Sequence, residues 1–240
     1  MEFDIFEYTS RAGRQTNEDS VGHRIFENEA VFTVADGLGG HSLGEVASAT
    51  AVDTVLSCFN TPISDSGLLI EKSIQKANNA ILGIQKEKGQ ILKSTLALLL
   101  ITSFDIYFAN VGDSRVYMLR NGEITEYTDD HSVAYKKYKA GEIAREEIGF
   151  DEDQSSLLRT LGSEDRYEPS IRTLNLIPQK GDAFLLCSDG FWEYVKDLEI
   201  EVDYAKAGDA KEWALNLLAR AMDRVDGDND NITVQTIILR

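Results

Sequence analysis

Short β-rich runs dominate this sequence, and they follow one another in groups instead of alternating with helices. The runs lie at 30–35, 95–102, 105–110, 115–120, 182–187 and 232–239. Asn121 and Gly122 directly follow the fourth run and favour a two-residue hairpin turn. Because helices do not separate each pair of strands, we expect a mixed α+β layered fold instead of a doubly wound parallel sheet.

Helical periodicity predicts three helices between these groups. Apolar residues recur at steps of three and four at Ile70, Ile74, Ala77, Ile81 and Ile84. A second stripe runs from Trp213 to Val225, and a third helix is expected at about 43–59. The segment 129–165 is charged and poor in apolar residues, which indicates a mobile surface insertion: a solvated helix pair with a loop, or a segment flanking a site.

Charge excludes some classes of partner. The chain has 24 basic and 41 acidic residues among 240, a net charge of −17, so nucleic acid and anionic membranes are disfavoured. No segment approaches a membrane span, and the N-terminus has no targeting pattern, so a cytoplasmic location is expected. Cys58 and Cys187 have neither zinc nor disulfide spacing and are expected to be reduced core residues.

Carboxylates stand at the ends of three apolar runs. Asp36 is followed by Gly-Leu-Gly-Gly, Asp189 by Gly190, and Asp230 stands just before the last run. A turn that uses Asp to bond its own backbone is an equally good reading of Asp36 taken alone. If the three strands are neighbours in one sheet, however, the carboxylates converge at one edge, where they repel unless protonated or bridged by cations.

The ligand types restrict which cation would fit. Oxygen ligands select Mg²⁺ or Mn²⁺, whereas the three histidines supply no cluster suited to zinc. The spacing argues against a calcium loop of the EF-hand type counted from Asp226, because Asn231 stands where glycine belongs and Ile237 where the bidentate Glu belongs.

Two further clusters carry weaker signals. Arg14 lies four residues before Glu18, with Asp19 next, which combines an anion-binding guanidinium with two acids. Asp113 lies in a Gly-Asp-Ser turn between two strands. An ordinary surface ion pair for Arg14 and a turn role for Asp113 are the alternatives.

Eight segments together carry a family resemblance that spans residues 13–239. In order they are GRQTNEDS, VADGLGGH, LKSTLALLL, ANVGDSRVY, TDDHS, LLRTLG, CSDGFWEYV and DNDNITV. The chain resembles the metal-dependent protein serine/threonine phosphatases of the type 2C class, particularly their bacterial branch. The resemblance implies a single catalytic domain over 1–240: a central β-sandwich of two mainly antiparallel sheets flanked by helices on both faces, with a flap at about 132–161.

The resemblance also implies a binuclear Mn²⁺ or Mg²⁺ centre. Asp36 looks like the carboxylate that bridges both ions, Gly37 like a backbone carbonyl ligand, and Asp189 and Asp230 like the other direct ligands. Glu18 and Asp19 resemble holders of metal-bound waters. Arg14 matches the phosphate-binding arginine, and Asp113, with Asp189, matches the ligands of a weaker third ion.

The implied reaction is direct hydrolysis of phosphoserine or phosphothreonine in proteins by a metal-activated water, opposing a bacterial-type Ser/Thr kinase. Some relatives carry a His general acid where this chain has Leu38, so the proton donor is unassigned; His41 is a candidate. Lys93 replaces a residue that is usually small, and we expect this to affect packing more than chemistry. A catalytically inactive binding scaffold is the alternative, and a structural calcium-binding domain is the weakest one.

Overall fold

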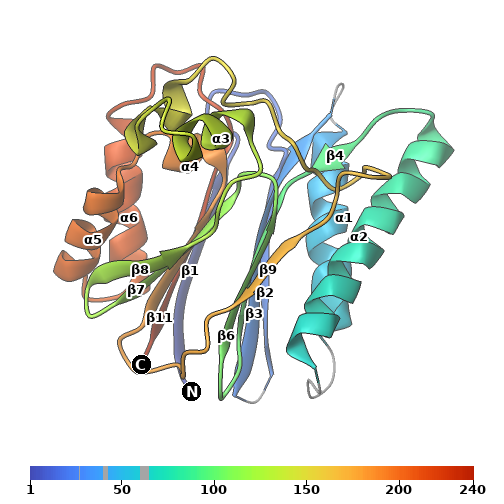
Figure 1. The fold of residues 1–240 in the computed structure, drawn as a ribbon. Coiled ribbons are helices and arrows are strands. Elements are labelled where there is room, and N and C mark those ends of the chain that lie inside the picture. Colours follow the sequence, from blue (N-terminus) through green and yellow to red (C-terminus); the bar gives the residue numbers. More distant parts are fainter. Residues whose placement is uncertain (27, 40–42, 60–64) are drawn as a thin grey trace.

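The computed structural model describes residues 1–26, 28–39, 43–59 and 65–240, and it shows two β-sheets packed face to face between two layers of helices (Figure 1). The first sheet has the strand order β1-β11-β10-β7-β8, with every pair antiparallel. Its strands are β1 (Phe3–Ser10), β7 (Arg115–Arg120), β8 (Glu123–Tyr127), β10 (Ala183–Cys187) and β11 (Ile232–Leu239).

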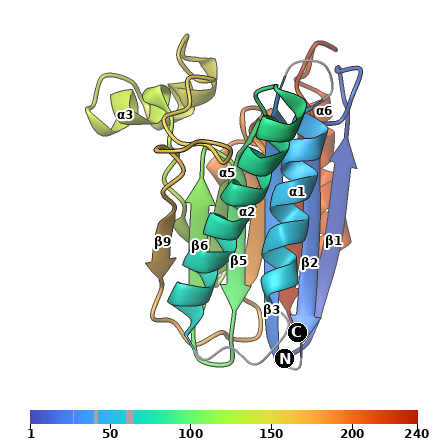
Figure 2. The same ribbon diagram turned by 90° about the vertical axis from the view of Figure 1, so that its right-hand side faces the viewer.

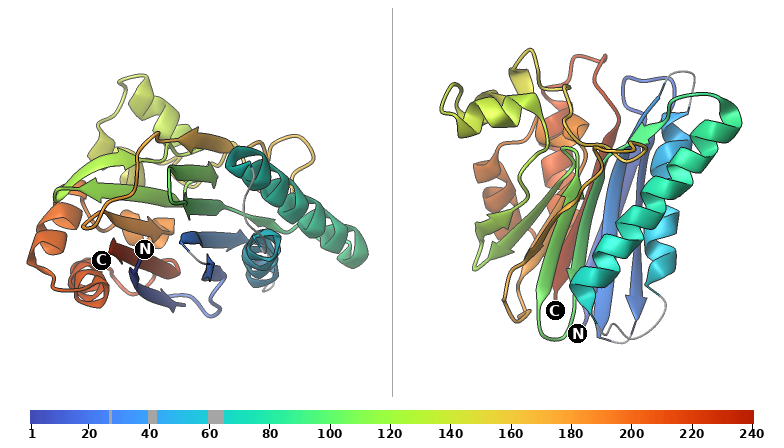
Figure 3. Two further views of the ribbon diagram at one scale, coloured as in Figure 1. Left: turned by 90° about the horizontal axis from the view of Figure 1, so that it is seen from below. Right: turned by 45° about the vertical axis from the view of Figure 1, so that its right-hand side comes forward.

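The second sheet has the order β2-β3-β5-β6-β9 and is also antiparallel, with β4 beside β3. Its strands are β2 (Asp19–Phe26), β3 (Glu29–Leu38), β4 (Lys93–Ser94), β5 (Leu96–Ile101), β6 (Ile106–Val111) and β9 (Ser170–Thr173). Helices α1 (Gly44–Cys58) and α2 (Ser66–Lys88) cover its outer face, while α5 (Asp197–Lys206) and α6 (Ala210–Met222) cover the first sheet (Figure 3). The expected α+β sandwich with helices on both faces is confirmed.

The apolar cores explain why some strands are easy to recognise. Phe32, Phe108, Met118 and Phe184 meet between the two sheets, and separate clusters fill the spaces under α1 and α2 and under α5 and α6. Strands β3, β5, β10 and β11 are therefore buried on both faces. Strands β5 and β10 are wholly apolar, whereas β3 and β11 also bury polar residues such as Thr33 and Gln235. The predicted runs match these strands to within a few residues.

The elements not predicted have mixed composition. Strands β1 and β2 carry several polar side chains and are mostly half-buried, so neither shows a clear apolar run. Helix α5 was not predicted either, and α6 ends at Met222, before the predicted limit at Val225. The expected hairpin joins β7 to β8: Asn121 has φ of 58° and Gly122 has φ of 88°, as a tight two-residue turn requires.

The charged segment 129–165 projects from the sandwich but is anchored to it. It contains α3 (Val133–Lys139) and the 3₁₀ helix η1 (Arg145–Phe150), and α3 stands out from the sheets in Figure 2. Tyr135 and Ile148 are buried in the cluster beside the first sheet. The segment is thus a surface insertion, as predicted, but part of it belongs to the core, because Tyr135 and Ile148 are buried.

The membrane-span and cysteine expectations can each be compared with the structure. Within the described residues, no helix is both long and apolar enough to cross a membrane. Cys58 and Cys187 are both free, but only Cys187 is buried; Cys58 is half-buried, so its assignment to the core holds only in part.

Candidate metal centre

The three strand-end carboxylates come from two sheets, so the condition that their strands are neighbours in one sheet holds for Asp189 and Asp230 but not for Asp36. Strands β10 and β11 are antiparallel neighbours, so Asp189, after β10, and Asp230, before β11, lie at the same edge. Asp36 lies inside β3 of the second sheet, two residues before its end. The facing sheets bring all three to one end of the sandwich, where the charges of Asp189 and Asp230 help to raise the pKa of Asp36.

Asp36 is clamped through its backbone. Its N–H donates to Oγ1 of Thr95 over 2.9 Å, and its carbonyl accepts from the Thr95 N–H at 2.8 Å and from the Ser94 hydroxyl at 2.9 Å. The side chain is buried, and burial is the main cause that raises the pKa of Asp36 well above its usual range; the charge of Asp189 adds to it. The turn alternative therefore does not describe Asp36, which is a rigidly held, buried carboxylate.

Asp19 lies directly opposite Asp36 in the pairing of β2 with β3. Its Oδ2 accepts from the Ser188 hydroxyl at 2.7 Å, while its Oδ1 is buried and has no partner in the described part of the chain. Burial raises the pKa of Asp19 to about 6, although the nearby hydroxyls of Thr233 and Ser188 oppose the shift. A buried acceptor without a donor calls for a bound water or cation.

Asp189 begins the short helix α4 (Asp189–Trp192). Burial raises its pKa to about 7, and the charge of Asp230 contributes next. Gly190 permits this packing, because a Cβ there would lie 2.2 Å from the carbonyl oxygen of Asn231. The start of α4 thus packs against the backbone just before β11, at a distance that only glycine allows.

Asp230 faces Arg14 in this structure. Nη2 of Arg14 lies 3.1 Å from Oδ2 of Asp230, with the two side chains 52% and 42% exposed, so the surface ion pair considered as an alternative is present. Asn231 holds the Arg14 loop: its amide donates to the carbonyls of Arg11 and Thr16, each at 3.0 Å, and its Oδ1 accepts from the Glu18 N–H at 2.7 Å. Asn231, next to Asp230, therefore positions the loop that places the Arg14 guanidinium beside the carboxylates.

A cavity of about 450 Å³ opens at this end of the sandwich. Most of the predicted site residues contribute to its wall: Arg14, Glu18, Asp36, Gly37 and Asp230. Gly37 is required by packing, since a Cβ there would lie 2.0 Å from the carbonyl oxygen of Gly44. Leu38 also lines the cavity and is partly exposed, whereas His41 lies outside the described residues.

Asp113 lies in the turn between β6 and β7, where Gly112 has φ of 93°. It is buried, and burial raises its pKa well above the usual range, with the charge of Asp189 as the next cause. The turn is therefore an accurate description of its backbone, and the buried carboxylate is also close enough to Asp189 and Asp130 for their charges to raise its pKa.

The oxygen atoms of these side chains are the donors that a divalent cation prefers, but they are not yet close enough together to coordinate one. Among the described residues, no three His, Cys, Asp or Glu side chains already converge on a single ion position. Asp230 is turned to Arg14, and Oδ1 of Asp189 accepts from the Gly190 N–H at 2.7 Å. The oxygen-only donors, the raised pKa values of Asp19, Asp36 and Asp189, and the orphaned Asp19 oxygen nevertheless match what Mg²⁺ or Mn²⁺ would satisfy.

Sequence reasoning missed the polar residues that support the carboxylates. Ser94, Thr95, Ser188 and Asn231 each bond the backbone or side chain of an acidic residue or of the Arg14 loop. The sequence indicates these residues only by their position, because each lies within one of the eight segments that carry the family resemblance.

Known proteins resemble this chain over nearly its full length. Residues 8–223 match the sequence pattern of the family described as protein phosphatase 2C. The serine/threonine phosphatase stp of Listeria monocytogenes is 32% identical over 92% of this chain and 89% of its own length. The crystal structure of the Mycobacterium tuberculosis serine/threonine phosphatase PstP/Ppp has a TM-score of 0.86 at 30% identity, with 99% of each chain covered. The PstP catalytic domain in complex with 2 manganese ions has a TM-score of 0.84 at 28% identity, over 98% and 97% of the two chains.

Proposed function

Because the chain belongs to the protein phosphatase 2C family, we propose that it is a metal-dependent serine/threonine protein phosphatase that acts at the acidic cavity. The observation that carries the proposal is the meeting of buried carboxylates with raised pKa, Asp36 and Asp189 above all, beside the exposed guanidinium of Arg14. Phosphoproteins are the substrates, and a serine/threonine kinase that phosphorylates them is the implied counterpart.

We assign the metal ligands from the family resemblance, and the oxygen donors that line the cavity support this assignment. Asp36, Asp189 and Asp230, with the carbonyl of Gly37, would hold two Mn²⁺ or Mg²⁺ ions. Glu18 and Asp19 would orient waters around them, and Asp113 would share a weaker third ion with Asp189. When bound, the ions would supply a water of lowered pKa and neutralise phosphoryl oxygens.

Arg14 has two roles in this proposal. Its ion pair with Asp230 holds that carboxylate at the cavity mouth while no cation is bound. A cation held by Asp230 would compete with this ion pair, and the guanidinium would then be available to donate to two phosphoryl oxygens of the substrate and to stabilise their charge. In this proposal Asp230 would serve the cation and Arg14 the phosphate.

The proton donor for the departing seryl or threonyl oxygen is not Leu38, which has no exchangeable side-chain proton. We assign residues 1–240 to a single catalytic domain and the segment at about 132–161 to a flap beside the site. Its anchoring by Tyr135 and Ile148 supports a fixed base for that flap.

Hydrolysis of a phosphothreonine peptide, with and without Mn²⁺, tests the proposal. Wild type is expected to turn over only with metal, and Asp36→Asn and Asp230→Asn to lose turnover while remaining folded. Asp165→Asn is the matched control, because the Asp165 side chain is 85% exposed. Absence of turnover in wild type, together with absence of metal binding, would reject the proposal in favour of a binding scaffold.

A further inference from the structure

The backbone carbonyl of Asp113 is held by a side chain that belongs to the helix of Asp189. The indole Nε1 of Trp192 donates to the carbonyl oxygen of Asp113 over 3.0 Å, and this contact is buried. Asp189 is the first residue of α4, and Trp192 is the last. Helix α4 therefore carries both Asp189, one carboxylate of the proposed weaker cation site, and Trp192, which holds the backbone of Asp113, the other carboxylate of that site.

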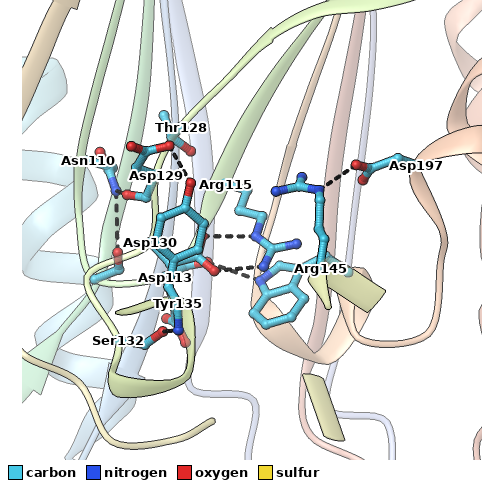
Figure 4. Close-up of polar contacts among 12 residues, drawn as sticks. Asn110, Asp113, Arg115, Thr128, Asp129, Asp130, Ser132, Tyr135, Arg145 and Asp197 are labelled. Atoms are coloured by element: carbon cyan, nitrogen blue, oxygen red, sulfur yellow. Dashed lines mark hydrogen bonds and ion pairs between the residues drawn. The ribbon is translucent and has the colours of Figure 1, made fainter. Parts of the chain in front are cut away.

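The indole is itself fixed by a buried ion pair. The guanidinium carbon of Arg115 lies 3.5 Å from the centroid of the Trp192 ring. Arg115 donates to both carboxylate oxygens of Asp130, at 2.9 and 2.6 Å. Asp113, Arg115 and Asp130 lie together in Figure 4. A bidentate pair holds the guanidinium in one plane, so the ring stacked on it has little freedom to move.

The other side of the Asp113 turn is held by His131. The backbone N–H of Gly112 donates to the ring Nδ1 of His131 at 3.2 Å, and the backbone N–H of His131 donates to the Gly112 carbonyl at 2.9 Å. Since Nδ1 accepts, the ring proton is on Nε2, which lies 2.8 Å from the hydroxyl of Ser170. With His131 on one side and Trp192 on the other, the turn has a defined position relative to α4.

We infer that Trp192 is a positioning residue: its indole N–H sets the separation of the Asp113 and Asp189 carboxylates, and thereby the affinity of the cation site that they share. The inference rests on the proposed function, which supplies the cation. Two buried carboxylates repel each other, so a cation between them is held well only when both are kept at the right spacing. Trp192 provides that spacing because it links the two segments directly.

The chain offers a matched control in its second tryptophan. Trp213 is also buried, and its indole N–H donates to the carbonyl of Ile200 at 3.1 Å, within the layer of α5 and α6. The metal-free protein should therefore give two indole signals in a ¹⁵N NMR spectrum. During titration with Mg²⁺ alone, we expect the Trp192 signal to shift in the weakest binding step and the Trp213 signal to stay. A Trp192 signal that does not respond overturns the inference.

Calorimetric titration of metal-free variants with Mn²⁺ provides the second test. Trp192→Phe keeps a ring for Arg115 but removes the N–H, and we expect about tenfold weaker binding at the weakest site. Trp213→Phe loses an equivalent hydrogen bond and should bind as wild type does. Because Trp192 acts through Asp113, the double variant Trp192→Phe/Asp113→Asn should match Asp113→Asn alone.

The outcomes separate this inference from the proposed function. A wild type that binds Mn²⁺ and hydrolyses the phosphopeptide, with Trp192→Phe binding identically, overturns only the role of Trp192. Losses that simply add in the double variant overturn it as well. A wild type that binds no divalent cation overturns both. Melting temperatures of the two Phe variants identify any loss that comes from unfolding, and the NMR titration needs no variant at all.

Discussion

Arg14 and Asp230 form an ion pair at the mouth of the acidic cavity, with Nη2 3.1 Å from Oδ2. The pair joins the residue proposed to bind phosphate to one proposed to bind metal. A cation would therefore compete with Arg14 for Asp230, and a phosphate group would compete with Asp230 for Arg14. Metal binding and phosphate binding are therefore expected to depend on one another.

Arg14→Ala is the first prediction that follows. We expect kcat/KM for a phosphopeptide to fall by about tenfold or more, because a charged donor to the phosphoryl group is lost. Mn²⁺ affinity should not fall, since Asp230 no longer has a competing partner. Steady-state kinetics and calorimetry check both points. Arg11→Ala is the control, as Arg11 lies in the same loop and contributes its carbonyl; equal effects of the two variants would contradict the prediction.

The buried carboxylates should make the metal-free protein less stable as pH rises. Burial raises the pKa of Asp189 to about 7 from an ordinary value of 3.8. Between these values the folded state keeps a proton that the unfolded state has released, so the free energy of unfolding falls as pH rises through this window. Asn cannot ionise. Metal-free Asp189→Asn should therefore melt at a higher temperature than wild type at pH 8, and the difference should shrink towards pH 4.

Added Mn²⁺ should reverse this order. The cation stabilises the ionised carboxylates of wild type, whereas the variant has lost one ligand, so wild type should gain more in melting temperature at pH 8. Thermal melts with and without metal at both pH values are sufficient. Equal melting temperatures of the metal-free proteins at pH 8 would refute the assignment of a raised pKa.

Arg115→Met should be strongly destabilising. The Arg115 and Asp130 side chains are 6% and 0% exposed, and removing one partner leaves the other charge buried alone. We expect a loss of about 3–5 kcal/mol in the free energy of unfolding, measured by urea denaturation without metal. Arg166→Ala is the comparison, because that side chain is 73% exposed and 4.0 Å from Asp165; its effect should stay within about 0.5 kcal/mol. Similar losses would show that the Arg115 pair is not buried in solution.

Gly190→Ala should damage the metal centre through the backbone. The added Cβ would lie 2.2 Å from the Asn231 carbonyl, so the start of β11 must move, and Asp230 with it. We expect weaker Mn²⁺ binding and a lower melting temperature. Gly83→Ala is the control: within α2 its Cβ would have no heavy atom of the described residues within 4 Å, and Ala is expected to stabilise the helix by about 0.5–1 kcal/mol. Wild-type metal affinity in Gly190→Ala would contradict the expectation.

The central strands and the acidic residues of the site could be predicted from the sequence for a physical reason. Strands such as β3 and β10 are covered on both faces, so most of their side chains are apolar and an aspartate at or just after the end of the strand stands out. Strands β1 and β2 are mostly half-buried and mix polar with apolar side chains, and their sequence is correspondingly ambiguous.

Local sequence thus determined that Asp36, Asp189 and Asp230 each stand at a strand end, because periodicity and turn residues are local properties. Only the tertiary structure decided that they meet across two sheets instead of within one, since the packing of facing sheets depends on contacts between distant segments. The same holds for Asp113 and Trp192, which are joined by a hydrogen bond between residues 79 positions apart. Arg14 and Asp230, 216 positions apart, are likewise paired only by the fold.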